Sequence, residues 1–245
     1  MNPRNAQGFF LPLGRLVAVP FVLRGVIQQA CLLQDPLIVP SLPGTGILVT
    51  EFRLAGQSVM CSDHGAPIEM WAPDCVVEGH RGLSIPLAAQ QEVVIETNQA
   101  AGTLSGGVGL RPILPDQVIP INQMGRGLDY VFGLGSVVAG AGADAVLVAR
   151  AQRPCMLGQL VITTTAAPMD IAIRSITVNG IELQGGAALA EQSAGCFSPQ
   201  CTDDDGCVLG FPVSANDTVQ IMLHNWNAAA ITVSAGCFVL PSGAM

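Results

Sequence analysis

Short apolar runs rich in Val, Ile and Thr recur along the whole chain, and Gly, Pro, Asn and Asp separate one run from the next. Runs of about five to nine such residues between turn-forming residues are typical of β-strands. No stretch keeps a helical period with a cap at each end. The pattern therefore predicts an all-β protein. In the second half it predicts strands at 131–138, 144–150, 155–165, 169–178, 181–184, 207–213, 218–224 and 230–240.

The first half predicts a matching series of strands. Val178-Asn179-Gly180-Ile181 is a hairpin signal, because Asn-Gly accepts the two positive φ angles of a type I′ turn. Ala55-Gly56 stands at the same place in the first half. The strands predicted there lie at 15–24, 31–39, 46–54, 57–61, 66–71, 83–88, 91–97 and 103–111.

The two halves align with each other when the chain is shifted by 124 residues. The shift grows to 126 after the first hairpin and to 127 near the end. Matched pairs include Cys31 with Cys155, Ile38 with Ile162, Gly56 with Gly180, Pro86 with Pro212, and Asn98 with Asn225. A period this long exceeds the roughly 20–50 residues of solenoid repeats. It indicates two copies of one small domain.

About eight strands in each copy suit a jelly roll, in which two antiparallel sheets pack face to face. An immunoglobulin-like sandwich is the alternative, but its Cys…Trp…Cys core is not evident. The prediction is therefore two tandem jelly-roll β-sandwiches from an internal duplication, a double jelly roll. The first occupies residues 1–114 and the second 129–245, and a linker rich in Pro and Gly spans 115–128.

The composition indicates a subunit of a larger assembly or a membrane-proximal protein. Half of the residues are hydrophobic, only 11% are charged, and the mean hydropathy is +0.50. Large apolar patches on a single chain usually mark interaction surfaces. Phe9 to Ala30 is largely apolar, but internal Pro and Arg residues argue against a membrane span or a signal peptide. Without a signal peptide, a reducing compartment with free thiols is expected.

The charge pattern excludes several functions. The net charge is −8, and all ten basic residues are arginines. An acidic protein lacks the basic stripe that neutralises phosphates, so direct nucleic-acid binding is not expected. The absence of lysine excludes a P-loop, Schiff-base chemistry and the strand lysine of protein kinases.

No catalytic constellation stands out, so the protein is not expected to be an enzyme or to carry a cofactor. His64, His80 and His224 lack metal-binding spacing, and each is expected to be a surface or hydrogen-bonded polar residue. A His-x-His cupin signature, a His-Glu-x-x-His motif and a Gly-x-Ser-x-Gly elbow are all absent. Gly140 to Ala145 mimics a dinucleotide fingerprint, but the residues that follow are strand-like rather than helical.

One segment concentrates thiols and carboxylates. Its candidate metal ligands are Cys196, Cys201, Cys207, Asp203 and Asp205. Thiolates would suit Zn²⁺ and carboxylates Ca²⁺, but the spacing matches neither a zinc knuckle nor an EF-hand. A disulfide to Cys207 in an oxidised particle is another alternative. The simplest interpretation is a solvated acidic loop between two strands.

Two tandem jelly rolls without a catalytic constellation resemble the double jelly-roll major capsid proteins of small tailless icosahedral bacteriophages of the corticovirus and tectivirus kind. The resemblance covers the whole chain but rests on architecture alone, so no residue role is carried over. It implies a virion protein made in the host cytoplasm. Three copies would form a pseudo-hexagonal homotrimer that tiles a shell. The implied partners are other copies, other capsid or vertex proteins, and an internal membrane beneath the shell.

Three other functions stay open. One is a minor capsid or spike protein. Another is a tandem β-sandwich that binds carbohydrate or acts as an adhesin, for which Trp71, Trp226 and Tyr130 are the candidate aromatic contacts and Trp226 is expected at an exposed strand end. The third, a bicupin-like enzyme, is disfavoured by the missing metal ligands.

Overall fold

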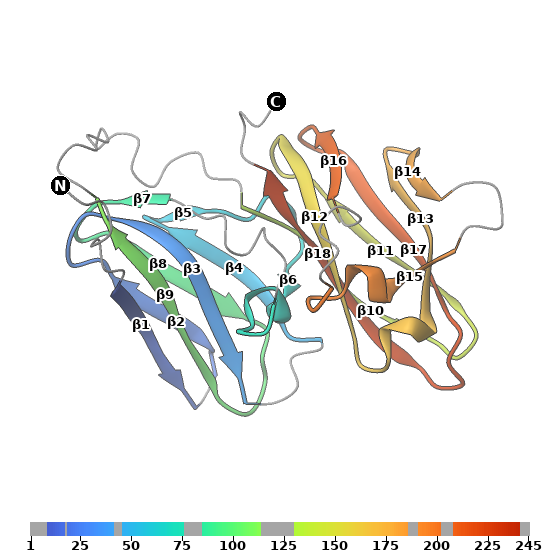
Figure 1. Cartoon of the computed structure of the whole chain (residues 1–245), viewed down its shortest axis with the longest axis horizontal. Helices are drawn as coiled ribbons and strands as arrows, with labels where there is room; N and C mark the ends of the chain where they lie inside the picture. Colours follow the sequence, from blue (N-terminus) through green and yellow to red (C-terminus); the bar gives the residue numbers. More distant parts are fainter. Residues whose placement is uncertain are drawn as a thin grey trace.

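The protein folds into two β-sandwiches that stand side by side (Figure 1). The computed structural model describes residues 9–17, 19–41, 46–75, 85–113, 130–185, 191–201 and 208–240. The strands of each sheet pair in antiparallel fashion. The predicted all-β class is therefore confirmed. The predicted linker, residues 115–128, lies outside the described residues.

The first sandwich has one sheet in the order β1-β9-β3-β7 and a second in the order β2-β8-β4-β5. Strand β6 pairs with the start of β4, and the 3-10 helix η1 (Ile68–Trp71) follows it. The strands are β1 (Phe9–Leu16), β2 (Val22–Val26), β3 (Cys31–Pro40), β4 (Leu48–Leu54), β5 (Gln57–Ser58), β6 (Ala66–Pro67), β7 (Ile85–Leu87), β8 (Glu92–Thr97) and β9 (Leu104–Pro112).

The second sandwich repeats this plan with the sheet orders β10-β18-β12-β16 and β11-β17-β13-β14. Strand β15 pairs with β13 as β6 pairs with β4. Its described residues also form the 3-10 helices η4 (Pro168–Asp170) and η5 (Ala194–Phe197). The strands are β10 (Val131–Ala139), β11 (Asp144–Arg150), β12 (Cys155–Thr164), β13 (Ile171–Val178), β14 (Ile181–Gly185), β15 (Gln192–Ser193), β16 (Val208–Val213), β17 (Thr218–Asn225) and β18 (Ile231–Leu240).

Both sandwiches have jelly-roll topology. With β6 and β15 set aside, the eight main strands of each half follow the orders 1-8-3-6 and 2-7-4-5 in its two sheets. The first and last strands therefore pair in one sheet, and the second and seventh pair in the other. This is the arrangement of two Greek keys wrapped into a sandwich. The predicted double jelly roll is confirmed.

The duplication extends to backbone detail. Ala55 and Gly56 have φ angles of 52° and 78°, and their counterparts Asn179 and Gly180 have 49° and 77°. Both positive φ angles are those that a type I′ turn requires between two strands of right-handed twist. The pairing of β4 with β8 shifts register between Val49 and Glu51, and the pairing of β13 with β17 shifts register between Ile173 and Ser175. These two irregularities are again 124 residues apart. Matching turns and bulges fix matching registers.

The hydrophobic pattern explains which strands are half-buried and which are buried on both faces. In β11 buried and exposed residues alternate strictly, because only one face of this edge strand meets the core. Strands β12 and β18 are buried almost throughout. A side chain of each strand, Val161 of β12 and Phe238 of β18, packs against the core of the first sandwich.

Two predicted strands need correction. The run 15–24 is not one strand, because β1 ends at Leu16 and β2 begins at Val22, with the turn at Val19-Pro20 between them. Proline lacks the amide proton that a ladder needs, so the apolar run is divided into two strands that belong to different sheets. The run 66–71 is the short strand β6 followed by η1.

Candidate functional site

The first sandwich docks on the second through an extended segment, residues 59–65, that lies along the edge of β10. The amide of Cys61 donates to the carbonyl of Val131 over 2.8 Å, and the amide of Gly135 donates to the carbonyl of Gly65 over 3.0 Å. The amide of Tyr130 donates to the carbonyl of Val59 over 3.0 Å. Strand β10 is the outermost strand of its sheet, so the segment completes that sheet by adding backbone to its edge.

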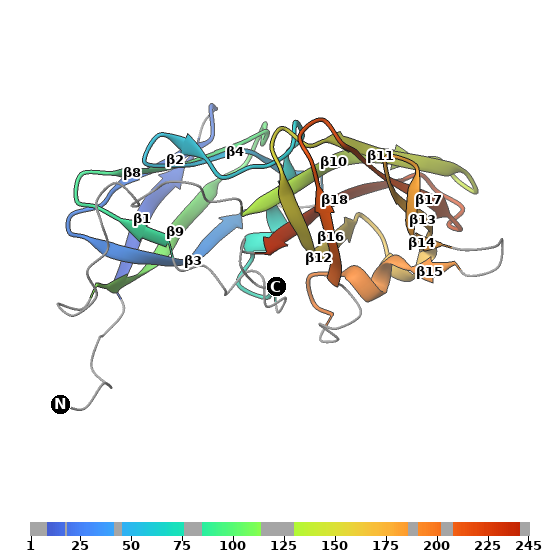
Figure 2. The same ribbon diagram turned by 90° about the horizontal axis from the view of Figure 1, so that it is seen from above.

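Two glycines make the close approach possible. A Cβ atom on Gly133 would lie 2.2 Å from the carbonyl oxygen of His64, and one on Gly236 would lie 2.9 Å from Sδ of Met70. Ala66 and Pro67 of β6 also lie against Gly236. The flat surface of β10 and β18 therefore receives β6 and η1, as the view from above also indicates (Figure 2).

Aromatic side chains connect the two hydrophobic cores. Phe52 meets Trp71 and Tyr130 edge to face, with ring centroids 6.4 and 6.0 Å apart. Tyr130 in turn lies 5.5 Å from Phe238 of β18. Phe238 and Val161, from the second sandwich, belong to the core cluster of the first. The docking of the sandwiches is consequently a buried apolar interface as well as a hydrogen-bonded one.

The two ends of the molecule carry the counterparts of these docking elements. Helix η5 and strand β15 correspond to η1 and β6 at a shift of 126 residues, so Cys196 stands where Met70 does. At the opposite end, β1 and β9 correspond to β10 and β18, and Gly109 stands where Gly236 does. Cys196 is exposed, and a Cβ on Gly109 would meet nothing closer than 3.6 Å. Both surfaces are therefore open among the described residues.

The match between the two acceptor surfaces is not exact. Gly133 pairs with Gly236, whereas the counterpart of Gly236, Gly109, pairs with Phe10. The Phe10 ring is 53% exposed and lies across Gly107 on the β1–β9 face. A partner that docks here must pack against an aromatic ring instead of against bare backbone.

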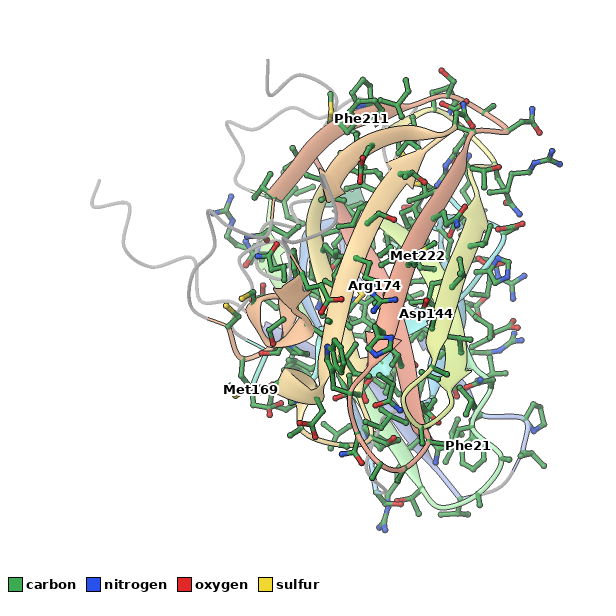
Figure 3. The ribbon with its side chains drawn as sticks, turned by 90° about the vertical axis from the view of Figure 1, so that its right-hand side faces the viewer. Phe21, Asp144, Met169, Arg174, Phe211 and Met222 are labelled. Atoms are coloured by element: carbon green, nitrogen blue, oxygen red, sulfur yellow. The ribbon has the colours of Figure 1, made fainter. Side chains whose placement is uncertain are left out.

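A polar cluster lies on the outer face of the β11–β17–β13 sheet, which points away from the first sandwich (Figure 3). Nη1 of Arg174 donates to Oδ1 of Asp144 over 2.6 Å, and Nε donates to Oε1 of Glu191 over 2.8 Å. Nδ1 of His224 lies 2.6 Å from the same oxygen of Asp144. Nε1 of Trp226 donates to Oε2 of Glu191 over 3.2 Å. The guanidinium thus bridges two carboxylates beside an indole ring.

These contacts keep both carboxylates ionised. The hydrogen bond with His224, with help from the Arg174 charge, holds the pKa of Asp144 below its usual value. The two hydrogen bonds to Glu191, first that from Arg174, lower the pKa of that carboxyl. The hydrogen bond to Glu191 and the charges of the two acids raise the pKa of Arg174. At neutral pH the cluster therefore presents two negative groups with one positive group between them.

The acidic cysteine segment is only partly described. Cys196 is exposed in η5, Cys201 is half-buried beyond it, and the two are not joined by a disulfide. Cys207, Asp203 and Asp205 lie outside the described residues. Within the described ranges, no group of three or more His, Cys, Asp or Glu side chains is placed to hold a metal ion.

The histidines occupy different environments. Nδ1 of His64 lies 2.7 Å from Oδ1 of Asp63, beside the docking segment. His224 is 8% exposed and belongs to the polar cluster. The predicted polar contacts are thus confirmed for both residues, whereas His80 lies outside the described residues. Trp226 is 61% exposed at the end of β17, as predicted, whereas Trp71 and Tyr130 are buried and are excluded as surface contacts.

The paired cysteines differ in burial. Cys31 is buried, and burial raises the pKa of its thiol to about 11. Cys155, at the same place in β12, is half-buried. Cys31 therefore acts as a small buried hydrophobe, and its counterpart does so only in part.

Sequence reasoning missed the polar cluster. Its members come from β11, β13 and β17 and from the residues beside β15 and β17, and no motif connects them. The one available signal was Trp226 itself, next to His224 in an apolar chain poor in aromatics.

No protein-family model and no curated protein matches the chain. Among solved structures it is similar to the major capsid protein P2 of bacteriophage PM2, at 9% identity and a TM-score of 0.34, covering 98% of this chain and 100% of that one. It is similar to PNGF-II at 8% identity and a TM-score of 0.33 (96% and 66% covered), and to the plant receptor-like kinase ANX2 at 9% and 0.25 (98% and 90%). Scores this low establish no shared function. In the described part of the chain, no helix has the length and apolar character to cross a membrane.

Proposed function

We propose that this protein is a structural virion protein, the major capsid subunit of an icosahedral shell, and that it forms pseudo-hexagonal homotrimers. The observation that carries the proposal is the way its two jelly rolls dock. The first roll presents β6 and η1, and the second accepts them on β10 and β18. The contact is head-to-tail, because the two rolls contribute different surfaces.

A head-to-tail contact between similar units can be repeated. The counterparts of its two surfaces, η5 with β15 and β1 with β9, stand open at the two ends of the described chain. If η5 and β15 of one copy dock on β1 and β9 of the next, each added copy extends the same arrangement. Such a series forms a ring when the rotation closes, and three copies supply six similar rolls.

Exposed apolar side chains support the proposal that the β1 and β9 surface binds a neighbouring copy. Phe10, Val17 and Val19 are exposed by 53%, 71% and 63%, and all three lie on or just after β1. A neighbour that covers them would gain about 25 cal/mol for each Å² of apolar surface removed from water. An exposed edge strand also favours a partner that protects it from unspecific pairing.

The solution mass tests the proposal. Light scattering of the purified protein should give about 76 kDa, three times the 25.3 kDa of one chain, and negative-stain images should show hexagonal outlines. Phe10→Arg and Cys196→Arg, each at one end, should convert the trimer to a folded monomer. Val148→Arg is the matched control, because the first sandwich already carries Arg24 at this position. A wild-type monomer at all concentrations would refute the proposal.

A capsid trimer has further partners in the virion. Neighbouring trimers, vertex proteins and an internal membrane are the expected contacts in a virion assembled in the host cytoplasm, and nucleic acid is not among them. Copy number in a purified particle separates this role from that of a minor capsid or spike protein. A major subunit should dominate the protein content of the particle.

A further inference from the structure

The Trp226 ring is held rigidly in an exposed position. Its backbone amide donates to the carbonyl of Asp170 over 2.8 Å, and its indole nitrogen donates to Glu191. The His224 ring meets it edge to face at a centroid distance of 4.2 Å. A tryptophan that is 61% exposed yet fixed at three points leaves a flat apolar surface in water. Such a surface loses no further side-chain entropy when a ligand covers it.

Hydrogen-bonding groups beside the ring remain available. The contacts of Asp144 with the described residues all use Oδ1, and those of Arg174 use Nε and Nη1. Within the described residues, Oδ2 of Asp144 and Nη2 of Arg174 therefore form no hydrogen bond with the protein. The side chains are also accessible, since Asp144 is 51% and Arg174 32% exposed. An acceptor and a donor thus stand near the aromatic surface with their positions already fixed.

The order of charges selects the ligand. Arg174 lies between Asp144 and Glu191, so a cationic ligand would meet a guanidinium whose charge already neutralises much of the two acids. An anionic ligand would meet a carboxylate on either side of that guanidinium. A neutral ligand rich in hydroxyl groups suits both, because a hydroxyl donates to a carboxylate and accepts from a guanidinium. Its apolar face can cover the indole.

We infer that Trp226, Asp144, Arg174 and Glu191 form a binding site for a neutral saccharide. The pyranose ring stacks on Trp226 through its C–H face, and neighbouring hydroxyls bridge Asp144 and Arg174. The first sandwich carries no such site, because Thr50 and Gly65 stand at the positions of Arg174 and Glu191. The site borders the surface proposed to bind the next copy, since Glu191 directly precedes β15, but every residue of the site comes from one chain and its test does not require the trimer.

The test uses the full chain and a set of neutral sugars, namely glucose, galactose, mannose, N-acetylglucosamine and their short oligomers. In NMR spectra of ¹⁵N-labelled protein, one sugar of the set should shift the indole Nε1–H signal of Trp226 and leave that of buried Trp71 unchanged. Trp226→Phe assigns the signal by its loss. Titration should give a dissociation constant in the millimolar range for a monosaccharide, as expected for a shallow surface site, and a lower one for an oligomer.

Variants separate binding from folding. Trp226→Ala should weaken the affinity about tenfold or more, and Trp226→Phe by less, because phenylalanine keeps part of the apolar ring surface on which the sugar stacks. Met169→Ala is the control, since Met169 is 80% exposed near this end of the sandwich and belongs to no described hydrogen bond of the cluster. Saccharide affinity unchanged in Trp226→Ala would overturn the inference. So would a lack of response to every sugar, and choline binding in its place would reassign the site to a cation.

Discussion

The glycine at position 133 gives the sharpest test of how the two sandwiches dock. In Gly133→Ala the new methyl group would lie 2.2 Å from the carbonyl oxygen of His64 and 2.4 Å from the backbone of Gly65. Backbone atoms cannot rotate away as the tip of a side chain can. Gly133 has an ordinary negative or extended φ, so alanine adds no backbone strain of its own. The substitution therefore acts only on the contact between the segment 59–65 and β10.

The magnitude follows from what must move. Inserting a methyl group into a packed contact costs about 1–3 kcal/mol. If the segment lifts from β10, the bonds Gly135–Gly65 and Cys61–Val131 are lost, at about 0.5–1.5 kcal/mol each. Alanine has a lower conformational entropy than glycine in the unfolded chain, which offsets about 0.4–1 kcal/mol of this loss. The expected loss in the free energy of unfolding is about 2–4 kcal/mol, which corresponds to a melting temperature lower by about 5–15 °C.

Thermal and urea unfolding followed by circular dichroism measure this loss. Gly109→Ala is the control, because Gly109 stands where Gly236 does on the corresponding surface of the first sandwich and its methyl group would meet nothing closer than 3.6 Å. It should change the free energy of unfolding by less than about 1 kcal/mol. If Gly133→Ala proves as stable as the wild type, the sandwiches do not dock through this segment. The docking within the chain would then no longer support the proposed contact between copies.

Four further predictions concern single side chains. Buried Asn225 donates to three carbonyl groups, the nearest that of Ala229 at 2.8 Å, so Asn225→Ala should lower the free energy of unfolding by about 2–4 kcal/mol in urea titrations. Replacing its exposed counterpart in Asn98→Ala should lower the free energy of unfolding by only about 1 kcal/mol. Equal losses in the two variants would contradict this reasoning. Burial raises the pKa of Cys237 from 9.0 to about 12, so the unfolded thiol ionises first as pH rises, and stability should fall by about 1.4 kcal/mol per pH unit above pH 9. Cys237→Ala should remove that part of the slope. Burial also raises the pKa of Tyr130, the single tyrosine, so tyrosinate absorbance should appear only as the protein unfolds. Maleimide should label Cys196 first in the monomer, and assembly should protect it; equal labelling in both states would place the seam elsewhere.

The fold could be predicted because its determinants are local and occur twice. Asn179-Gly180 and Ala55-Gly56 fix the same turn at the same register, and each half carries enough short apolar runs for a jelly roll. The division of the run 15–24 could not be predicted from hydrophobicity. Both parts are apolar, and only the assignment of β1 and β2 to different sheets separates them.

The polar cluster could not be predicted because it depends on sheet register over long sequence distances. Asp144 meets His224 because these residues are direct partners in the β11–β17 ladder. Arg174 reaches both Asp144 and Glu191 across the neighbouring strands. A shift of one residue in any of these pairings would turn a member to the opposite face. Spacing along the chain contains no trace of that geometry.

The two halves of the chain have diverged where they would bind a partner. Met70, Ala66 and Pro67 dock on the second sandwich, whereas their counterparts are Cys196, Gln192 and Ser193. The docking that the chain holds permanently is apolar and buried, and the corresponding end is more polar and open to water. A surface that must remain soluble until it meets another copy has to be more polar than one that is covered as the chain folds. The contact between copies should therefore be weaker than the contact between the two sandwiches of one chain. Dilution should dissociate the copies under conditions in which the two sandwiches of each chain stay docked.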